Sequence, residues 1–337
     1  MLLRSLLPQN TRKICCNGLF LQIRYGSNYA KNADNKNTQL MKTQDTVVEK
    51  IRKRFPRLSA MYGLVYGGMR GIFGDLKECI RVSNKISEHD SLEPLTLEEL
   101  EFIYNFKRNA RTLLPIVALA VLPFGNAFII PLVYFNPRKR VTYHFWTEHQ
   151  RATFPVEDHK DRLEHRKIIL DYMKQCPRGR IPENISNDWH KLLAKLDSGA
   201  RPELSEIAKV SPMFHRRGPF YFQTLPKSHL IHLAATYGIT TIFSPKQKMI
   251  KFAGLGMLMD KKIIERGGPK ALSTELRSKI CYMRGVDSMN MSPEEQIDYL
   301  QKWIKLNAKI DMSNYSLLLH TPILLGYNAG HDVLQKR

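Results

Sequence analysis

One uncharged stretch constrains this chain more than any other feature. Residues 113–135 read LLPIVALAVLPFGNAFIIPLVYF and contain no Asp, Glu, Lys or Arg. As a helix they would extend about 35 Å, enough to cross a hydrocarbon core of about 30 Å. Pro115, Pro123 and Pro131 interrupt the stretch, but membrane helices tolerate proline because neighbouring groups satisfy the freed carbonyls. The stretch therefore predicts one transmembrane helix shaped by its prolines. The alternative is a buried helix of a soluble protein.

The residues on either side of this stretch are of the types found at membrane–water interfaces. Basic residues stand on both sides of it: Lys107, Arg108 and Arg111 before, and Arg138, Lys139 and Arg140 after. Aromatic residues, which settle at the membrane–water interface, gather near the second edge: Tyr134, Tyr143 and Trp146. Lipid headgroups are therefore expected at both edges.

The N-terminal composition predicts a mitochondrial destination. Arg4, Arg12, Lys13 and Arg24 occur in the first 30 residues, and no acidic residue precedes Asp34. The apolar residues are scattered among these charges, unlike the continuous core of a secretory signal. We therefore predict a presequence over 1–30, followed by a linker and amphipathic helices over 31–112. The alternative is a disordered basic tail.

The charge balance points to anionic partners. Lys and Arg number 52 against 31 Asp and Glu, a formal net charge of +21, which favours RNA, ribosomes or anionic lipid headgroups. No zinc-finger spacing or aromatic RNA-binding signature sharpens this prediction, and we expect no DNA partner. The 5 cysteines include no C-x-x-C pair, so reduced thiols are expected.

The order of helical signals predicts an all-α fold. Gly63, Gly67 and Gly71 stand four apart within YGLVYGGMRGIFG, which we interpret as a weak and interrupted amphipathic helix. A membrane-embedded helix is the alternative for this segment. A short helix capped at Thr96 is expected over 95–106, leading into the apolar stretch.

The C-terminal half reads as a series of capped helices. Helix starts are predicted at Ser244-Pro245, Ser273 and Ser292-Pro293, the last with a capping box to Glu295. Helix ends are predicted at Gly238, Gly268 and Gly285. One apolar stripe, expected to face the core, comprises Ile297, Leu300, Trp303 and Ile304.

Nothing in the sequence predicts catalysis. His144, Glu148 and His149 lack the i, i+4 histidine pairing of a zincin helix, so an interfacial or surface role is favoured over a metal site. The mixed charges of 158–167 indicate a solvated helix face. Gly254 and Gly256 form no dinucleotide fingerprint. We expect no enzyme, no cofactor and no metal.

Two regions of the sequence resemble the LETM family. One is LPFGNAFIIPLVYFNPRKRVTYHFW. The other contains LSTELRSKICYMRG, SPEEQIDYLQKWIKL and SLLLHTPILLGYN, in which Glu275-Leu276, Arg284-Gly285, Tyr299-Leu300 and Trp303 are the most specific positions. The absence of zipper heptads and of a calcium loop resembles the short, LETM domain-containing branch.

The resemblance implies a single span in the mitochondrial inner membrane and a ribosome-binding-like helical domain in the matrix. That domain is expected over 160–327, with a short tail over 328–337. In the long family members an acidic residue follows the Pro-Phe motif of the span, whereas here Pro123-Phe124-Gly125 leads to Asn126. Because cation/proton exchange needs a group that changes charge within the membrane, Asn126 is better interpreted as a helix-packing amide.

The expected function is therefore non-enzymatic. The matrix domain would bind mitochondrial ribosomes or matrix machinery and support mitochondrial structure and translation; the alternative is a K⁺/H⁺ or Ca²⁺/H⁺ homeostasis factor of the inner membrane. Inner-membrane lipid is a further expected partner, and homo-oligomerisation is left open. The candidate partner-binding residues are Arg138, Lys139, Arg140, Arg178, Arg180, Arg216 and Arg217.

Overall fold

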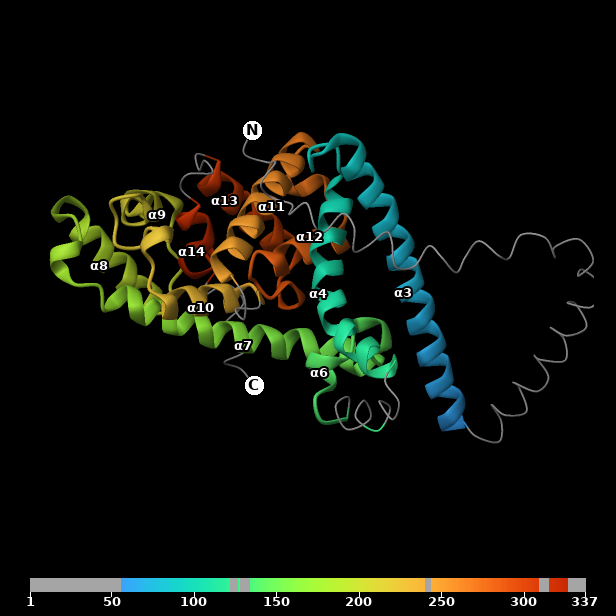
Figure 1. Cartoon of the computed structure of the whole chain (residues 1–337). Coiled ribbons are helices and arrows are strands. Elements are labelled where there is room, and N and C mark those ends of the chain that lie inside the picture. The colour runs from blue at the N-terminus through green and yellow to red at the C-terminus, as the bar shows by residue number, and fades with distance from the viewer. Residues whose placement is uncertain (1–55, 122–126, 128–133, 240–243, 309–314, 327–337) are drawn as a thin grey trace, which may run out of the picture. The chain divides into compact units, whose positions relative to one another are not determined.

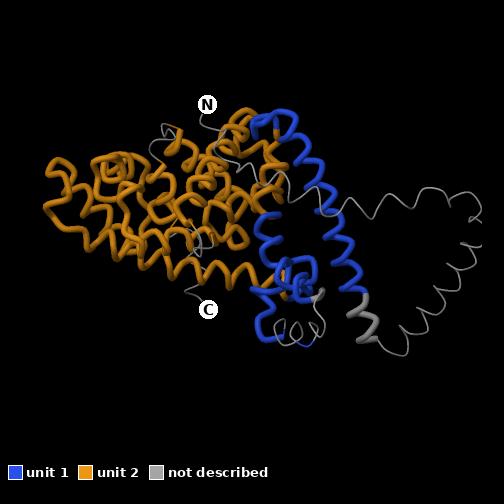
Figure 2. The backbone as a smooth tube through the Cα atoms, viewed as in Figure 1, with its two compact units in different colours: residues 1–94, 106–149 blue, residues 95–105, 150–337 orange. Residues whose placement is uncertain are grey.

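The computed structural model describes residues 56–121, 127, 134–239, 244–308 and 315–326. The regular secondary structure of these residues is helical, and they contain no strand, which confirms the all-α prediction. The chain divides into two compact units (Figure 2). Unit 1 comprises 1–94 and 106–149, and unit 2 comprises 95–105 and 150–337. Each unit is described by itself.

Unit 1 is built around one long helix. α3 (Pro56–His89) runs for 34 residues without a break, so the glycines do not interrupt it, contrary to the sequence interpretation. Two of them allow a close approach to the 3-10 turn η2 (Tyr143–Phe145). A Cβ atom on Gly68 would lie 2.2 Å from the Phe145 ring, and one on Gly71 would lie 2.5 Å from His144 Nδ1. These glycines are packing positions.

α4 (Leu97–Val121) is longer than the sequence suggested, because it continues past residue 106 and contains Pro115 in its interior. Its predicted start is confirmed. The Thr96 amide donates to the Glu99 carboxylate at 2.7 Å, and the Glu99 amide donates to Thr96 Oγ1 at 3.3 Å, a reciprocal capping box.

The expected transmembrane helix over 113–135 remains a prediction. Positions 122–126 and 128–133, with Pro123, Asn126 and Pro131, lie outside the described residues. In the part of the chain that the structure describes, no helix combines the length and the apolar character needed to cross a membrane.

Unit 2 contains the start of α4 and eight further described helices (Figure 1). In chain order these are α7 (Glu148–Lys174), α8 (Glu183–Asp197), α9 (Leu204–Lys209), α10 (Lys227–Thr236), α11 (Pro245–Glu265), α12 (Thr274–Met283), α13 (Pro293–Asn307) and α14 (Ser316–Leu324). Short 3-10 turns connect several of them: η3 (Arg178–Arg180), η4 (Ser211–Phe214), η5 (Phe222–Thr224), η6 (Pro269–Ala271) and η7 (Ser288–Asn290). Every residue from Tyr315 to Gly326 is buried, so α14 is a central helix of this unit.

Most predicted helix boundaries in unit 2 are confirmed. Ser273 Oγ accepts from the Leu276 amide, and Ser292 forms the predicted capping box with Glu295. α11 does begin at Pro245, but Ser244 makes no side-chain cap. At the predicted ends, Gly238, Gly268 and Gly285 have φ values of 66°, 91° and 93°, positive values that glycine adopts without strain.

The mixed-charge segment 158–167 forms a solvated face only in part, because Asp161, Glu164 and Lys167 are exposed, and the interpretation was wrong for three buried residues. On α7 the side chains of His159, Arg162 and Arg166 are 2 %, 4 % and 0 % exposed. They follow one another at three- and four-residue spacing and continue with Ile169 and Leu170 into one buried stripe. The positive charges of Arg162 and Arg166 can be buried because each guanidinium group donates a hydrogen bond to a backbone carbonyl.

Candidate functional site

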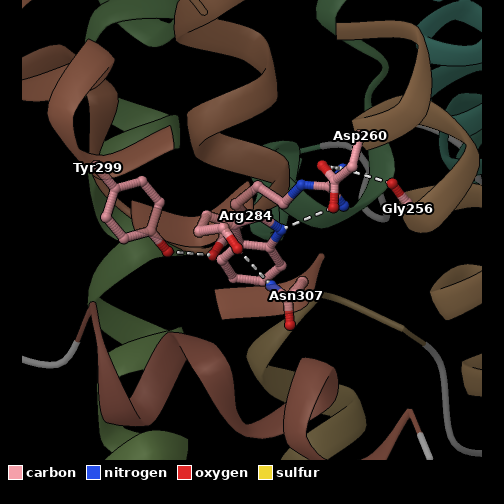
Figure 3. A network of polar contacts seen from close by, with 6 residues as sticks. Gly256, Asp260, Arg284, Tyr299 and Asn307 are labelled. Atoms are coloured by element: carbon pink, nitrogen blue, oxygen red, sulfur yellow. Dashed lines mark hydrogen bonds and ion pairs between the residues drawn. The ribbon is translucent and has the colours of Figure 1, made fainter. Parts of the chain in front are cut away.

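A buried polar network joins α11, α12 and α13 around Arg284 (Figure 3). The Arg284 side chain is 1 % exposed. Its Nη2 donates to Asp260 Oδ1 at 2.7 Å and to the Gly256 carbonyl at 2.9 Å. From α13, Trp303 Nε1 donates to the other Asp260 oxygen at 3.1 Å. The Asp260 carboxylate thus accepts hydrogen bonds from both Arg284 and Trp303. A buried charge needs such partners to offset the loss of its hydration.

The same network fixes the backbone around Arg284. Tyr299 OH donates to the Arg284 carbonyl at 3.0 Å, and the guanidinium lies 5.2 Å from the Trp303 ring centroid. A Cβ atom on Gly256 would lie 2.6 Å from Arg284 Nη1. Gly256 therefore makes room for a guanidinium.

Burial governs the ionisation of this network. It raises the pKa of the Asp260 carboxyl, against the opposing effects of the Arg284 charge and the hydrogen bonds from Trp303 and Arg284. It also raises the pKa of Tyr299 far above its ordinary value, so the phenol stays a donor. Because the network is buried and hydrogen-bonded, it holds α11, α12 and α13 together.

Two arginines of α7 stabilise the C-terminus of α12. Arg162 Nη1 donates to the Tyr282 carbonyl at 3.2 Å, and Arg166 Nη2 donates to the Gly285 carbonyl. The helix ends in a Schellman motif, in which the Gly285 amide donates to Tyr282 and the Val286 amide to Cys281. Cations at a helix C-terminus also complement the macrodipole.

Two histidine pairs lie between α7, α10 and α14. His229 Nε2 and His320 Nε2 are 2.9 Å apart, as are His165 Nδ1 and His232 Nδ1. His320 Nδ1 lies 2.7 Å from the Ser316 carbonyl, which can only accept. His320 Nδ1 is therefore the donor, its Nε2 accepts, and His229 Nε2 carries the shared proton. This arrangement holds both rings neutral, and burial lowers the pKa of His229 to about 3 and of His320 to about 4.

An exposed pair of arginines is presented on the surface of unit 2 by a tight turn. Arg216 and Arg217 are the central residues of a turn closed by a 2.7 Å hydrogen bond from the Gly218 amide to the His215 carbonyl. We call His215–Gly218 the dibasic turn. A Cβ atom on Gly218 would lie 2.2 Å from the Met213 carbonyl oxygen, so the turn requires glycine.

Aromatic anchors on either side hold the dibasic turn. Phe214 and Phe220 are 0 % and 5 % exposed. Their ring centroids are 5.8 Å apart, and that of Phe220 lies 5.5 Å from Trp189 of α8. The Phe220 amide also donates to the Met213 carbonyl at 3.0 Å. Two cations are therefore held at a fixed place on a packed core.

The other basic candidates are distributed over both units. Arg138, Lys139 and Arg140 make up most of α6 (Pro137–Arg140) in unit 1. Arg178 and Arg180 belong to η3 in unit 2 and are exposed, as are Arg216 and Arg217. The seven predicted residues thus belong to three separate segments, one in unit 1 and two in unit 2.

His144, for which an interfacial or surface role was predicted, contacts α3 within unit 1. Its Nε2 donates to Asp75 Oδ2 of α3 at 2.9 Å. Over the described ranges, no group of three or more His, Cys, Asp and Glu side chains is arranged to hold a metal ion.

Comparison with known proteins assigns this arrangement to a family. The family model described as LETM1-like, RBD matches residues 95–324, which include the Arg284 network, the histidine pairs and the dibasic turn. The chain belongs to this LETM1-like family.

Relatives extend the likeness over most of the LETM1-like chain. It is 26% identical to LETM1 domain-containing protein 1 of Xenopus tropicalis over 289 residues, covering 85% of this chain and 82% of the relative. Proteins of the same name from Homo sapiens and Bos taurus are 23% and 24% identical, each covering 82% of this chain and 78% of the relative. The suspected family resemblance is confirmed.

Sequence reasoning found the positions of the family block but not their partners. Arg284, Tyr299 and Trp303 were selected, whereas Asp260, which joins two of them, was not. The i, i+4 spacing of Gly256 and Asp260 on α11 places both on one helix face, a signal that could have linked them to one partner. Arg162 and Arg166 share the same spacing on α7.

Proposed function

We propose that this LETM1-like chain is a non-enzymatic protein of the mitochondrial inner membrane whose helical domain binds the mitochondrial ribosome. The acid-free basic segment 1–30 supports mitochondrial import, and the uncharged stretch 113–135 supports a membrane anchor. The family description carries the abbreviation RBD, which we take as ribosome-binding domain. The domain would thereby support translation at the membrane and mitochondrial structure.

The observation that carries this proposal is the dibasic turn. Ribosomal RNA presents phosphates, and guanidinium groups bind phosphate oxygens in bidentate geometry. Arg216 and Arg217 are exposed, while Phe214 and Phe220 fix the turn in the core. Since the backbone is already ordered, little conformational entropy is lost when the turn meets a rigid partner. The formal net charge of +21 adds long-range attraction to a polyanion.

Arg178 and Arg180 are the second candidates, because η3 also exposes both side chains. Arg138, Lys139 and Arg140 in α6 suit a different role. They follow the apolar stretch directly in sequence, where cations meet anionic lipid headgroups at about 1 kcal/mol each. We assign α6 to the membrane edge and the dibasic turn to the ribosome.

Co-sedimentation with purified mitochondrial ribosomes tests the proposal. The full chain in mild detergent is sedimented with ribosomes across a salt series, beside the Arg216→Ala/Arg217→Ala variant. Binding of the parent should weaken steeply with salt, because phosphate neutralisation releases counterions. The variant should show a slope shallower by about 0.7–0.9 for each phosphate that it no longer neutralises.

Lys160→Ala/Lys167→Ala is the matched control, since it removes two exposed positive charges from α7 of the same unit and should leave the slope nearly unchanged. If the parent does not co-sediment even at low salt, the ribosome proposal is wrong, and the cation-homeostasis alternative becomes the leading one. If both double variants change the slope equally, general charge rather than the dibasic turn determines binding.

A further inference from the structure

Exposed apolar side chains are concentrated in unit 1. Of the thirteen large hydrophobic residues that are exposed in the described part of the chain, eleven lie in unit 1, and only Ile264 and Met289 lie in unit 2. Among the described residues, Val82 is the one buried hydrophobic side chain of unit 1. Unit 1 therefore presents its apolar surface outward, and such a surface marks an interaction site.

Five of these residues form a line along α3, which we call the α3 stripe. Tyr66, Met69, Phe73, Leu76 and Ile80 follow one another at alternating three- and four-residue spacing, which places them on one helix face. Tyr66 is 62 % exposed and Phe73 is 57 % exposed. At these positions large apolar side chains face outward.

A different face of α3 packs within unit 1. Gly68 meets Phe145, Gly71 meets His144, and Asp75 accepts from His144 Nε2. Val82, 2 % exposed, lies on this same face. The α3 stripe is therefore not the contact face of the helix with η2.

Basic residues border the α3 stripe on one side. Arg70 follows Tyr66 by four residues, and Lys77 follows Phe73 by four, so each lies one turn from a stripe residue. Both side chains are exposed. An apolar face beside cations is the pattern of helices that lie in a lipid interface, where the charges reach the headgroups.

A second copy of α3 fits the α3 stripe less well. If Tyr66 and Phe73 are heptad a positions, then Arg70 and Lys77 are e positions, which pair with g positions of a parallel partner. Those are Val65, Ile72 and Cys79, none of which is acidic. In an antiparallel pair the e positions would face each other, cation against cation. An anionic surface supplies the missing negative charge.

We propose that the α3 stripe lies in the interface of an anionic phospholipid bilayer, with Arg70 and Lys77 at the headgroups. α3 would then lie along the membrane surface without crossing it. This placement shares only the membrane location with the proposed function, and it involves no residue of the dibasic turn.

Tryptophan quenching by lipids with brominated acyl chains tests the proposal. The full chain carrying Phe73→Trp is reconstituted in phosphatidylcholine vesicles with or without phosphatidylglycerol, and the emission of the parent, which has 3 Trp, is subtracted. The introduced indole should be quenched by the bromine atoms, more strongly when phosphatidylglycerol is present.

Gly74→Trp is the matched control. It lies one residue further along α3, about 100° around the helix from Phe73, and a Cβ atom there meets nothing within 4 Å. Its quenching should be weak. Equal quenching at positions 73 and 74, or none at position 73 in anionic vesicles, overturns the proposal.

A charge variant and a cross-link distinguish an anionic bilayer from a second copy of α3 as the partner of the α3 stripe. Adding Arg70→Ala/Lys77→Ala to Phe73→Trp should lower the bound-to-free ratio of α3 on anionic vesicles by up to about thirty-fold. Met69→Cys should form no disulfide-linked dimer under oxidation in vesicles. Efficient dimer formation together with an unquenched indole in Phe73→Trp would assign the α3 stripe to a second copy. Ribosome co-sedimentation reports on unit 2, so either proposal can fail alone.

Discussion

In unit 2 the side chains of Trp189, Phe214 and Trp303 are 0 %, 0 % and 1 % exposed, whereas in unit 1 Tyr66 and Leu114 are 62 % and 70 % exposed. Unit 2 even buries arginine, because carbonyls and Asp260 meet the guanidinium groups. Among the described residues of unit 1, Val82 is the one buried hydrophobic side chain. The difference shows that unit 2 folds around its own side chains, and it is the reason for proposing that the exposed apolar face of unit 1 meets a lipid surface.

The largest effect that distinguishes the units should come from Trp303→Ala. Removing this buried ring should lower the free energy of unfolding of unit 2 by about 3–5 kcal/mol. Phe73→Ala, on the α3 stripe of unit 1, should change the free energy of unfolding of unit 2 by no more than about 0.5 kcal/mol. Urea unfolding of the full chain, followed by near-ultraviolet circular dichroism, measures both. Equal midpoints for parent and Trp303→Ala would contradict a core role for the ring.

The buried charge pair should be nearly as sensitive. Asp260→Asn leaves Arg284 buried without its carboxylate and should cost about 3–5 kcal/mol. The double variant Asp260→Asn/Arg284→Met should cost less than Asp260→Asn alone, because it removes the unpaired charge. If the single and double variants unfold at the same urea concentration, the two residues are not coupled in the folded state.

Acid should weaken unit 2 through its histidines. In the folded state the pKa of His229 is lowered to about 3 and that of His320 to about 4, mainly by burial. Between pH 6.5 and about 4 the unfolded chain therefore binds more protons, so stability falls as the pH falls, by up to about 1.4 kcal/mol per pH unit for each ring. Unfolding midpoints across this pH range measure the slope.

His229→Gln should reduce that acid slope, since glutamine does not titrate yet can still donate to His320 Nε2. His190→Gln is the control, because His190 is exposed on α8. A slope unchanged by His229→Gln but reduced by His190→Gln would locate the acid sensitivity outside the buried pair.

Two glycine substitutions should act with opposite signs. Gly285 has φ 93°, and a Cβ atom there would lie 3.0 Å from Pro322 Cβ, so Gly285→Ala should cost unit 2 about 1–2 kcal/mol. Gly74→Ala should instead stabilise α3 by about 0.5–1 kcal/mol, because Gly74 lies in open space within a helix. Thermal unfolding and far-ultraviolet circular dichroism read the two effects. A destabilising Gly74→Ala would show that α3 is packed at that position.

The sequence predicts features that depend on neighbouring residues. The Ser273 cap, the Ser292 capping box and the glycine helix ends follow from local geometry, and all were found. The bond from Arg284 to Asp260 spans 24 residues, and that from Arg166 to Gly285 spans 119. Such partners depend on how helices pack, so charge patterning misassigned Arg166 to solvent.

For the candidate site, charge alone selected Arg216 and Arg217. Their presentation depends on Phe214 and Phe220 entering one aromatic cluster with Trp189, and no spacing rule links residues of α8 to that turn. The unbroken course of α3 was likewise missed, because glycine propensity was weighed without the contacts of Gly68 and Gly71. Local rules fail where tertiary contacts override propensity.

Hydrogen–deuterium exchange of the full chain in neutral and in anionic vesicles tests the contrast between the units most directly. We expect the amides of α3 to exchange more slowly in anionic vesicles than in neutral ones, and the amides of α11, α12 and α13 to be strongly and equally protected in both. If α3 exchanges at the same rate in both lipids, or if protection of α11–α13 also depends on the lipid, then the account of a self-sufficient unit 2 and a lipid-dependent unit 1 is wrong.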